Sequence, residues 1–184
     1  MAHRPAAVVL EAVLLCLALN ALGALCDCVA DPQLAPRRPA RGLRPHLEVD
    51  RNTAGTIDRL HSGARVGRGD VVQLSYVAAG NRFGVIVSVD GRGEVTLHHP
   101  EDANEVPRVK TRGETPLASA FELDDAPGFE RFFFVTGRRV SLDPHAVVEA
   151  AHVLATQGPG AAQAESLPLP TELRQSSFLL RKFR

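Results

Sequence analysis

Hydrophobic and polar side chains alternate with a period of two residues through the middle of the chain. The alternation is clearest in three runs: VVQLSYV at 71–77, GVIVSVD at 84–90 and EVTLHH at 94–99. A two-residue period with many β-branched residues predicts half-buried antiparallel strands. The connection AAGNRFG and the short loop DGRG contain the glycines that tight hairpins require. The pattern therefore predicts consecutive hairpins in this region.

Further strand patterns flank these hairpins. Upstream, HLEVDR and GTIDRL predict another hairpin with NTAG at its tip, and downstream LASAFELDD and FERFFFVTG flank the turn Pro127-Gly128. The uninterrupted run 132–134, three phenylalanines, is typical of a strand covered on both faces. We expect seven or eight short strands over residues 46–140. The predicted fold is mainly β, a small antiparallel β-sandwich or partly open barrel.

The hydrophobic period changes after residue 140. Ser141 or Asp143 can cap a helix, Pro144 suits its first turn, and an apolar stripe runs through residues 147–154. QGPGAAQAESLPLP then predicts a linker, and QSSFLLRKF predicts an edge or closing strand. We expect residues 141–184 to form a helix, a linker and a closing strand that pack on the β-domain.

An apolar segment of about membrane-spanning length precedes the β-domain. Residues 7–26 are apolar apart from Glu11 and Asn20, which leaves three interpretations of region 1–28: a signal-anchor helix, a cleaved signal peptide, or a helix packed on the domain. Four arginines follow the segment, and by the positive-inside rule they oppose export of what comes after it. Residues 29–45, rich in Pro and Arg, predict an extended linker.

Composition narrows the function classes. The chain is 45% hydrophobic and 23% charged, which is ordinary for a globular protein and argues against wholesale disorder. Its formal net charge is zero, so it lacks the basic footprint of a nucleic-acid-binding protein. All three cysteines, Cys16, Cys26 and Cys28, lie in the N-terminal segment, so residues 29–184 offer no thiolate nucleophile and no cysteine-based zinc site.

The adjacent residues His98 and His99 are the first candidates for a chemical site. In a regular strand neighbouring side chains point to opposite faces, so the two imidazoles are not expected to bind one metal ion. Pro100 follows them and ends the strand. We predict that they mark a strand end, and that a ligand or catalytic role would need partners from elsewhere.

Other motifs carry less information. Arg68-Gly69-Asp70 matches the tripeptide that adhesion receptors bind, but here it precedes a strand, where a Gly-Asp turn is expected in any case. The acid pairs Asp102/Glu105 and Asp124/Asp125 lie in turn-like segments and are expected to be solvated loop carboxylates. Residues 101–116 predict a long surface loop. No catalytic, cofactor-binding or metal-binding residue is assigned.

Several stretches resemble one bacterial family. RGLRPHLEV, GARVGRGDVVQLSYVAAGNRFGVIVSVDGRGEVTLHHP, PLASAFELDDAPGFERFFFVTG and LPLPTELRQSSFLLRKF look like the C-terminal region of ActD-like proteins, over nearly all of residues 41–183. The resemblance implies a cytoplasmic part similar to zinc-finger anti-sigma factors, then a transmembrane helix and an extracytoplasmic β-domain. No His-x-x-x-Cys-x-x-Cys precedes the apolar segment here, so we expect the sigma-factor-binding part to be missing.

The sequence thus predicts a non-enzymatic β-domain with a sensing, signalling or regulatory binding role. Its expected place is the inner membrane with residues 46–184 extracytoplasmic (periplasmic), anchored by residues 7–26, or the periplasm after signal cleavage. A protein partner or a small ligand in the envelope is expected, and no nucleic acid and no cofactor. Two alternatives stay open: a hydrolase-type enzyme whose site combines His99, His61 and loop carboxylates, and a structural or adhesive component that uses Arg68-Gly69-Asp70.

Overall fold

The computed structural model of the chain describes residues 43–53, 55–137 and 142–183. Region 1–28 with its three cysteines, and most of the predicted linker 29–45, lie outside the described residues. Within the described residues, no helix is sufficiently long and apolar to cross a membrane.

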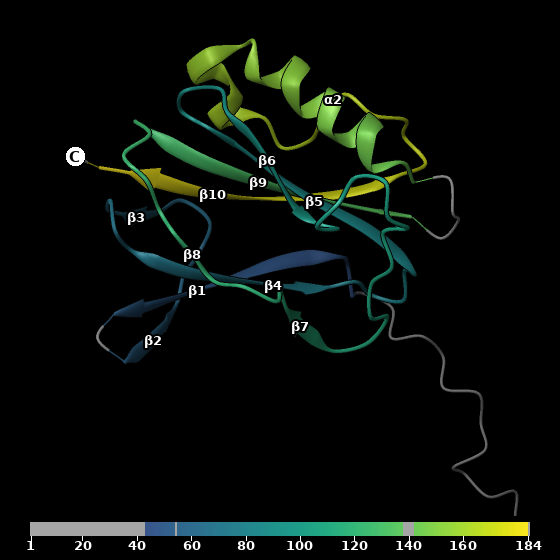
Figure 1. Ribbon diagram of the computed structural model, residues 1–184, viewed down its shortest axis with the longest axis horizontal. Helices are drawn as coiled ribbons and strands as arrows, with labels where there is room; N and C mark the ends of the chain where they lie inside the picture. The colour runs from purple at the N-terminus through teal and green to yellow at the C-terminus, as the bar shows by residue number, and fades with distance from the viewer. Residues whose placement is uncertain (1–42, 54, 138–141, 184) are drawn as a thin grey trace, which may run out of the picture. The chain divides into compact units, whose positions relative to one another are not determined.

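Two β-sheets and one α-helix make up the described part of the chain, as Figure 1 shows. Sheet A has the order β2 (Thr56–Arg59), β1 (His46–Thr53) and β4 (Val71–Val77), with β7 (Glu114–Pro116) and β8 (Phe121–Glu122) both paired to the far edge of β4. Sheet B has the order β3 (Ala64–Val66), β10 (Arg174–Lys182), β9 (Phe129–Gly137), β5 (Phe83–Asp90) and β6 (Val95–His99). All these pairs are antiparallel except β3 with β10. The prediction of a mainly β fold with one C-terminal helix is confirmed.

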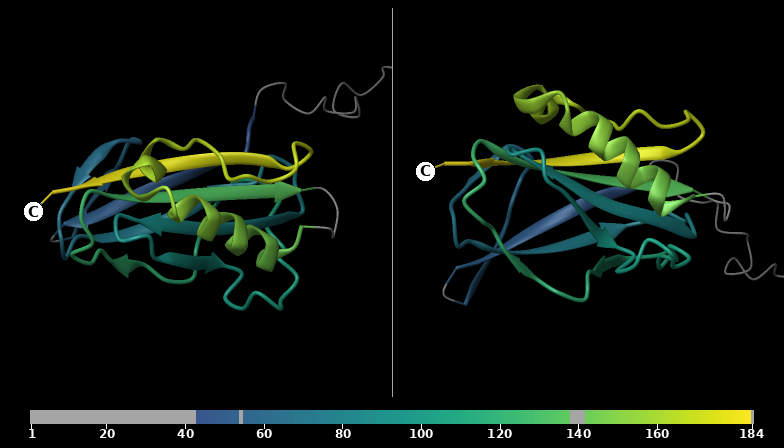
Figure 2. Two further views of the ribbon diagram at one scale, coloured as in Figure 1. Left: turned by 90° about the horizontal axis from the view of Figure 1, so that it is seen from above. Right: turned by 45° about the horizontal axis from the view of Figure 1, so that its top comes forward.

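The elements stack in three layers, with sheet B between sheet A and the helix α2 (Pro144–Ala155) (Figures 1 and 2). Alternate side chains of each strand point to opposite faces, which separates two hydrophobic clusters. One cluster lies between the sheets and includes Val49 and Leu74 of sheet A with Phe132 of sheet B. The other lies between sheet B and the helix and includes Phe133 and Leu154.

The middle strands of sheet B are buried on both faces. The run 132–134 behaves as predicted, since Phe132 and Phe134 face sheet A while Phe133 faces α2. For β5 the alternating pattern was misleading, because all eight of its residues are buried, not half of them. The reason is that β5 lies inside sheet B, with sheet A over one face and α2 over the other. Ser88 made the sequence pattern look half polar, although this serine is buried.

The helix follows its sequence signals. Asp143 is the N-cap, and its Oδ1 accepts a hydrogen bond from the backbone N of His145 at 3.0 Å. Pro144 occupies the first turn, and Val147, Ala151 and Leu154 are buried against sheet B. Ser141, the other candidate cap, lies outside the described residues.

The C-terminal strand returns to the sheet, but not at its edge. The sequence predicts an edge or closing strand, and β10 lies inside sheet B, paired with β9 on one side and with β3 on the other. β3 has three residues and is too short to show a strand pattern, so the sequence does not predict that another strand lies outside β10. The predicted linker contains a 3-10 helix, η2 (Gly158–Gln163), and only Phe121–Glu122 of the predicted strand LASAFELDD is a strand.

Candidate functional site

A β-bulge places both imidazoles of the His98–His99 pair on the same side of sheet B. Val87 pairs with Leu97 but Ile86 pairs with His99, so His98 is an extra residue on β6. The His98 ring lies 5.1 Å from the ring of Phe121, and the His99 ring lies 6.1 Å from that of Tyr76. The prediction that the two side chains point to opposite faces is therefore wrong, because it assumed a regular strand. The predicted strand end at His99 is confirmed.

The hydrogen bonds of these histidines are structural. His98 Nε2 lies 3.0 Å from Ser88 Oγ, and His99 Nε2 lies 3.1 Å from the carbonyl oxygen of Arg108. Burial lowers the pKa of His98 to about 4 and also lowers the pKa of His99, so both rings are neutral at pH 7. Among the described residues, no group of three His, Cys, Asp or Glu side chains could hold a metal ion.

His61 is not brought near His99. It is an exposed residue between β2 and β3, so it lies at the β3 edge of sheet B, whereas His99 lies on β6 at the opposite edge. Four strand spacings of about 4.8 Å separate these edges, roughly 19 Å in all. A hydrolytic site that combines these two histidines is not formed.

The Arg68-Gly69-Asp70 turn is held within the domain. Asp70 Oδ2 accepts hydrogen bonds from the backbone N of Gly67 at 2.9 Å and from Arg51 Nη1 at 3.4 Å. The backbone N of Gly69 donates to the carbonyl oxygen of Leu123 at 2.9 Å. The carboxylate that an adhesion receptor would need is thus engaged inside the protein, and the turn is tied to the segment after β8.

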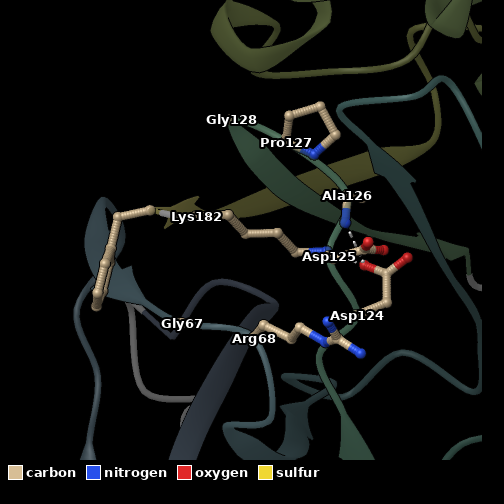
Figure 3. A pocket seen from close by; sticks show the side chains of 9 residues that line it. Gly67, Arg68, Asp124, Asp125, Ala126, Pro127, Gly128 and Lys182 are labelled. Atoms are coloured by element: carbon tan, nitrogen blue, oxygen red, sulfur yellow. Dashed lines mark hydrogen bonds and ion pairs between the residues drawn. The ribbon is translucent and has the colours of Figure 1, made fainter.

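A cleft of about 590 Å³ lies at the end of the sheets where β10 finishes (Figure 3). Three segments form it: the turn at 67–68, the loop 124–128 between β8 and β9, and Lys182 at the end of β10 with Phe183 after it. We call it the Lys182 cleft. Figure 3 shows Lys182 and Arg68 reaching toward the loop that carries Asp124 and Asp125.

Lys182 is a nearly inaccessible cation in the wall of this cleft. Its side chain is 4% exposed, and its Nζ lies 2.6 Å from Asp124 Oδ1 and 2.8 Å from Glu130 Oε2. Burial lowers the pKa of Lys182, but the hydrogen bonds that its ammonium group donates to the two carboxylates, together with their negative charges, raise it by more, so the net shift is upward. The hydrogen bond from Lys182 is the main reason that the pKa of Asp124 is lowered.

Arg92, in the hairpin between β5 and β6, holds the other side of the acidic loop. Its Nη1 lies 3.1 Å from Asp124 Oδ2 and its Nη2 lies 2.6 Å from Asp125 Oδ1. The hydrogen bond from Arg92 lowers the pKa of Asp125. The two carboxylates predicted to be solvated loop acids therefore remain exposed but form an ion-pair network with two cations.

Gly91 lets the β5–β6 hairpin approach the loop closely enough for this network. A Cβ atom built on Gly91 would lie 1.5 Å from the carbonyl oxygen of Pro127, so no side chain fits there. The backbone N of Gly91 also donates to the carbonyl oxygen of Phe129 at 3.0 Å. The hairpin and the loop are in direct backbone contact.

The outer wall of the cleft is Phe183, whose side chain keeps considerable exposure at 48%. A Cβ atom on Gly67 would lie 3.6 Å from the Phe183 ring, and Arg65 Cζ lies 5.2 Å from the ring centroid. The backbone N of Phe183 donates to the carbonyl oxygen of Val66 at 3.1 Å, which fixes the end of the chain against β3. The ring is thereby positioned although it remains half open to solvent.

Asp124 also borders a smaller hollow of about 250 Å³ on the neighbouring side of the acidic loop. His98 and Phe121 line it together with the carboxylates of Glu122 and Glu130. The buried histidine of β6 and the Lys182 cleft are therefore connected through one aspartate.

The arrangement favours binding over acid-base chemistry. Ion pairing lowers the pKa of Asp124 and Asp125 and raises that of Lys182, so each group is held in its charged form at neutral pH. A general acid or base works best when its pKa lies near the working pH. In Asp124, Asp125 and Lys182 the pKa is instead shifted further away from neutral pH.

The sequence contained only weak signals for this site. Asp124-Asp125 before Pro127-Gly128 marked a turn, and Lys182 followed an apolar strand. The contact between Lys182 and Asp124 joins positions 58 residues apart, and it depends on β10 lying next to β9. Comparison of the chain with models of protein families, with curated proteins and with solved structures finds no significant match, so this site is defined by its own geometry.

Proposed function

We propose that this chain is a non-enzymatic binding domain with a sensing or regulatory role in a bacterial envelope. The resemblance of residues 41–183 to the C-terminal region of ActD-like proteins supports an extracytoplasmic β-domain. The apolar character of residues 7–26 supports a membrane anchor or an export signal. The partner would be a protein or a small ligand of the envelope.

The finer architecture that we propose is a β-sandwich covered by a helix. In support, the two sheets have separate strand orders and share a hydrophobic cluster between their facing sides. Such a scaffold is rigid in its middle and can present loops at its ends. The Lys182 cleft is at one of these ends.

The Lys182 cleft is the observation on which the binding role depends. Its volume lies in the range of roughly 300–1,000 Å³ that is usual for small-molecule sites. Its walls combine ion-paired side chains with a half-exposed aromatic ring, Phe183. Groups fixed in one charge state are suited to recognition, whereas the alternative of a hydrolase would need His61 and His99 together.

Protease protection on the full chain tests the proposed location. A chain with a C-terminal tag should fractionate with the inner membrane, and protease added to spheroplasts should remove the tag. A matched chain that begins at residue 29 should be soluble and protected in the same spheroplasts. A full-length chain that is soluble and protected in the cytoplasm would overturn the proposal.

A further inference from the structure

We propose that the Lys182 cleft binds a small apolar monoanion, a carboxylic acid with an aryl or branched alkyl body. Arg68 would bind the carboxylate, and the ring of Phe183 would cover the apolar body. The inference depends on the proposed function in one respect, namely that this cleft is the binding site.

One cation at the cleft has no ion-pair partner among the described residues. The charged side chains that line the cleft or form an ion pair with its lining are equal in number: three cations, Arg68, Arg92 and Lys182, and three anions, Asp124, Asp125 and Glu130. Arg92 and Lys182 together contact all three carboxylates. For Arg68, no carboxylate oxygen of the described residues lies within 4.0 Å, and its effect on Asp125 is only a longer-range attraction.

An anionic ligand complements the guanidinium group of Arg68, which no carboxylate of the described residues contacts. The guanidinium group of arginine presents paired N–H donors that match the two oxygens of a carboxylate. Lys182 can assist, because its ammonium group has three N–H donors and only two are used by the carboxylates of Asp124 and Glu130. A single negative charge is favoured, because a second would meet Asp124 and Asp125 without a matching cation.

The rest of the lining is apolar or lacks a side chain. Ala126 and Pro127 face the cleft from the loop, and Phe183 closes it with a ring that is 48% exposed. Gly67 and Gly128 keep their part of the wall open. An aryl or branched alkyl group would gain apolar contact with this wall at little cost, since the ring is already held in place.

Three probes of one shape test the inference with the full chain in lipid nanodiscs: 3-phenylpropionate, 3-phenylpropanamide and 3-phenylpropylamine. Calorimetry should show the acid binding at least tenfold more tightly than the amide, and the amine more weakly than either. Backbone NMR signals of Gly67 and Gly128 should shift with the acid.

Substitutions then assign the contacts. Arg68→Gln should weaken binding of the acid at least tenfold and leave the amide unchanged, whereas Phe183→Leu should weaken both. Asp125→Asn should strengthen binding of the acid a few-fold. Arg181→Gln, an exposed neighbour on β10 that does not line the cleft, is the matched control and should change neither.

The possible failures differ in meaning. Equal affinities of acid and amide, an unchanged acid affinity in Arg68→Gln, or a preference for the amine would overturn the monoanion inference and leave the cleft as a binding site. If none of the probes shifts the signals of Gly67 or Gly128, both the inference and the assignment of this cleft are overturned, while the protease experiment still tests the location.

Discussion

The imidazole of His98 on sheet B stacks on the ring of Phe121 on sheet A, with centroids 5.1 Å apart and ring planes 29° apart. His98 lies on the same face of β6 as Thr96, which pairs with Ser88, and its Nε2 is anchored 3.0 Å from Ser88 Oγ. One ionisable side chain therefore takes part in the contact between the two sheets. Its protonation state should affect the stability of the domain.

We expect the domain to lose stability in mild acid because of His98. Burial lowers its pKa from 6.5 to about 4, so the unfolded chain binds the proton first as the pH falls. The full contribution is present above pH 6.5 and disappears progressively toward pH 4, a loss on the order of 3 kcal/mol. Urea unfolding at pH 7 and at pH 4 measures it.

The matched variants for this prediction are His98→Phe and His152→Gln. Phenylalanine keeps the aromatic packing on Phe121 but cannot be protonated, so the stability difference between pH 7 and pH 4 should shrink by most of that amount. His152 is exposed on α2, and its substitution should leave the difference unchanged. An equal pH dependence in His98→Phe and the parent chain would contradict the argument.

Removal of the ammonium group of Lys182 should destabilise the cleft end of the domain. Lys182→Met keeps the aliphatic length but leaves Glu130, whose side chain is only 12% exposed, without its cation. Breaking a buried ion pair from one side costs about 3–5 kcal/mol. The double variant Lys182→Met/Glu130→Gln should recover part of the loss, and Arg181→Met, at an exposed neighbouring position, should cost little. Urea midpoints compare the four chains, and a Lys182→Met midpoint equal to that of Arg181→Met would refute this assignment.

The sequence predicted most of the local structure because its signals were local. Three features depend on residues close in the sequence and appear as expected: the strand at 71–77 with Val72, Leu74 and Tyr76 in one cluster, the turn after Asp90 and the cap at Asp143. Where burial depended on a neighbouring element the pattern failed, as in β5, all of whose residues are buried. The position of β10 inside sheet B required a partner, β3, of only three residues.

The candidate site was harder to predict because its contacts span long distances in the sequence. A one-residue bulge turned His99 to the side of sheet B on which His98 lies, and a period-two pattern contains no sign of a bulge. The Lys182–Asp124 pair needs the chain to return from β8 through β9 and α2 to β10. The acidic doublet 124–125 and the lysine at the end of the last strand were visible in the sequence, but their pairing was not.

A methyl group at Gly91 should separate the β5–β6 hairpin from the loop that carries Asp124. The Cβ atom of Gly91→Ala would lie 1.5 Å from the carbonyl oxygen of Pro127, so the backbone must move. Overpacking of this kind costs typically about 1–3 kcal/mol, and more where backbone has to shift. Gly160→Ala is the control, because its Cβ atom would lie at an ordinary contact distance of 3.7 Å from Gln157 Cβ. If urea unfolding gives the two variants the same stability, the close approach at Gly91 is not a constraint on the fold.

The last strand should be required for folding, and the last two residues only for the cleft. A chain that ends at residue 173 lacks β10, which leaves the edges of β9 and β3 unpaired and removes Phe178 and Leu180 from the cluster between the sheets. We expect it to lose its cooperative urea transition and its dispersed NMR spectrum. A chain that ends at Lys182 keeps every strand pair of β10 but loses the hydrogen bond from Phe183 to Val66, the contact of Arg65 with the Phe183 ring, and the aromatic wall. It should unfold cooperatively at nearly the parent midpoint, with shifted signals confined to the cleft around Gly67. Cooperative unfolding of the chain that ends at residue 173 would show that sheet B is complete without its C-terminal strand, contrary to its position between β9 and β3.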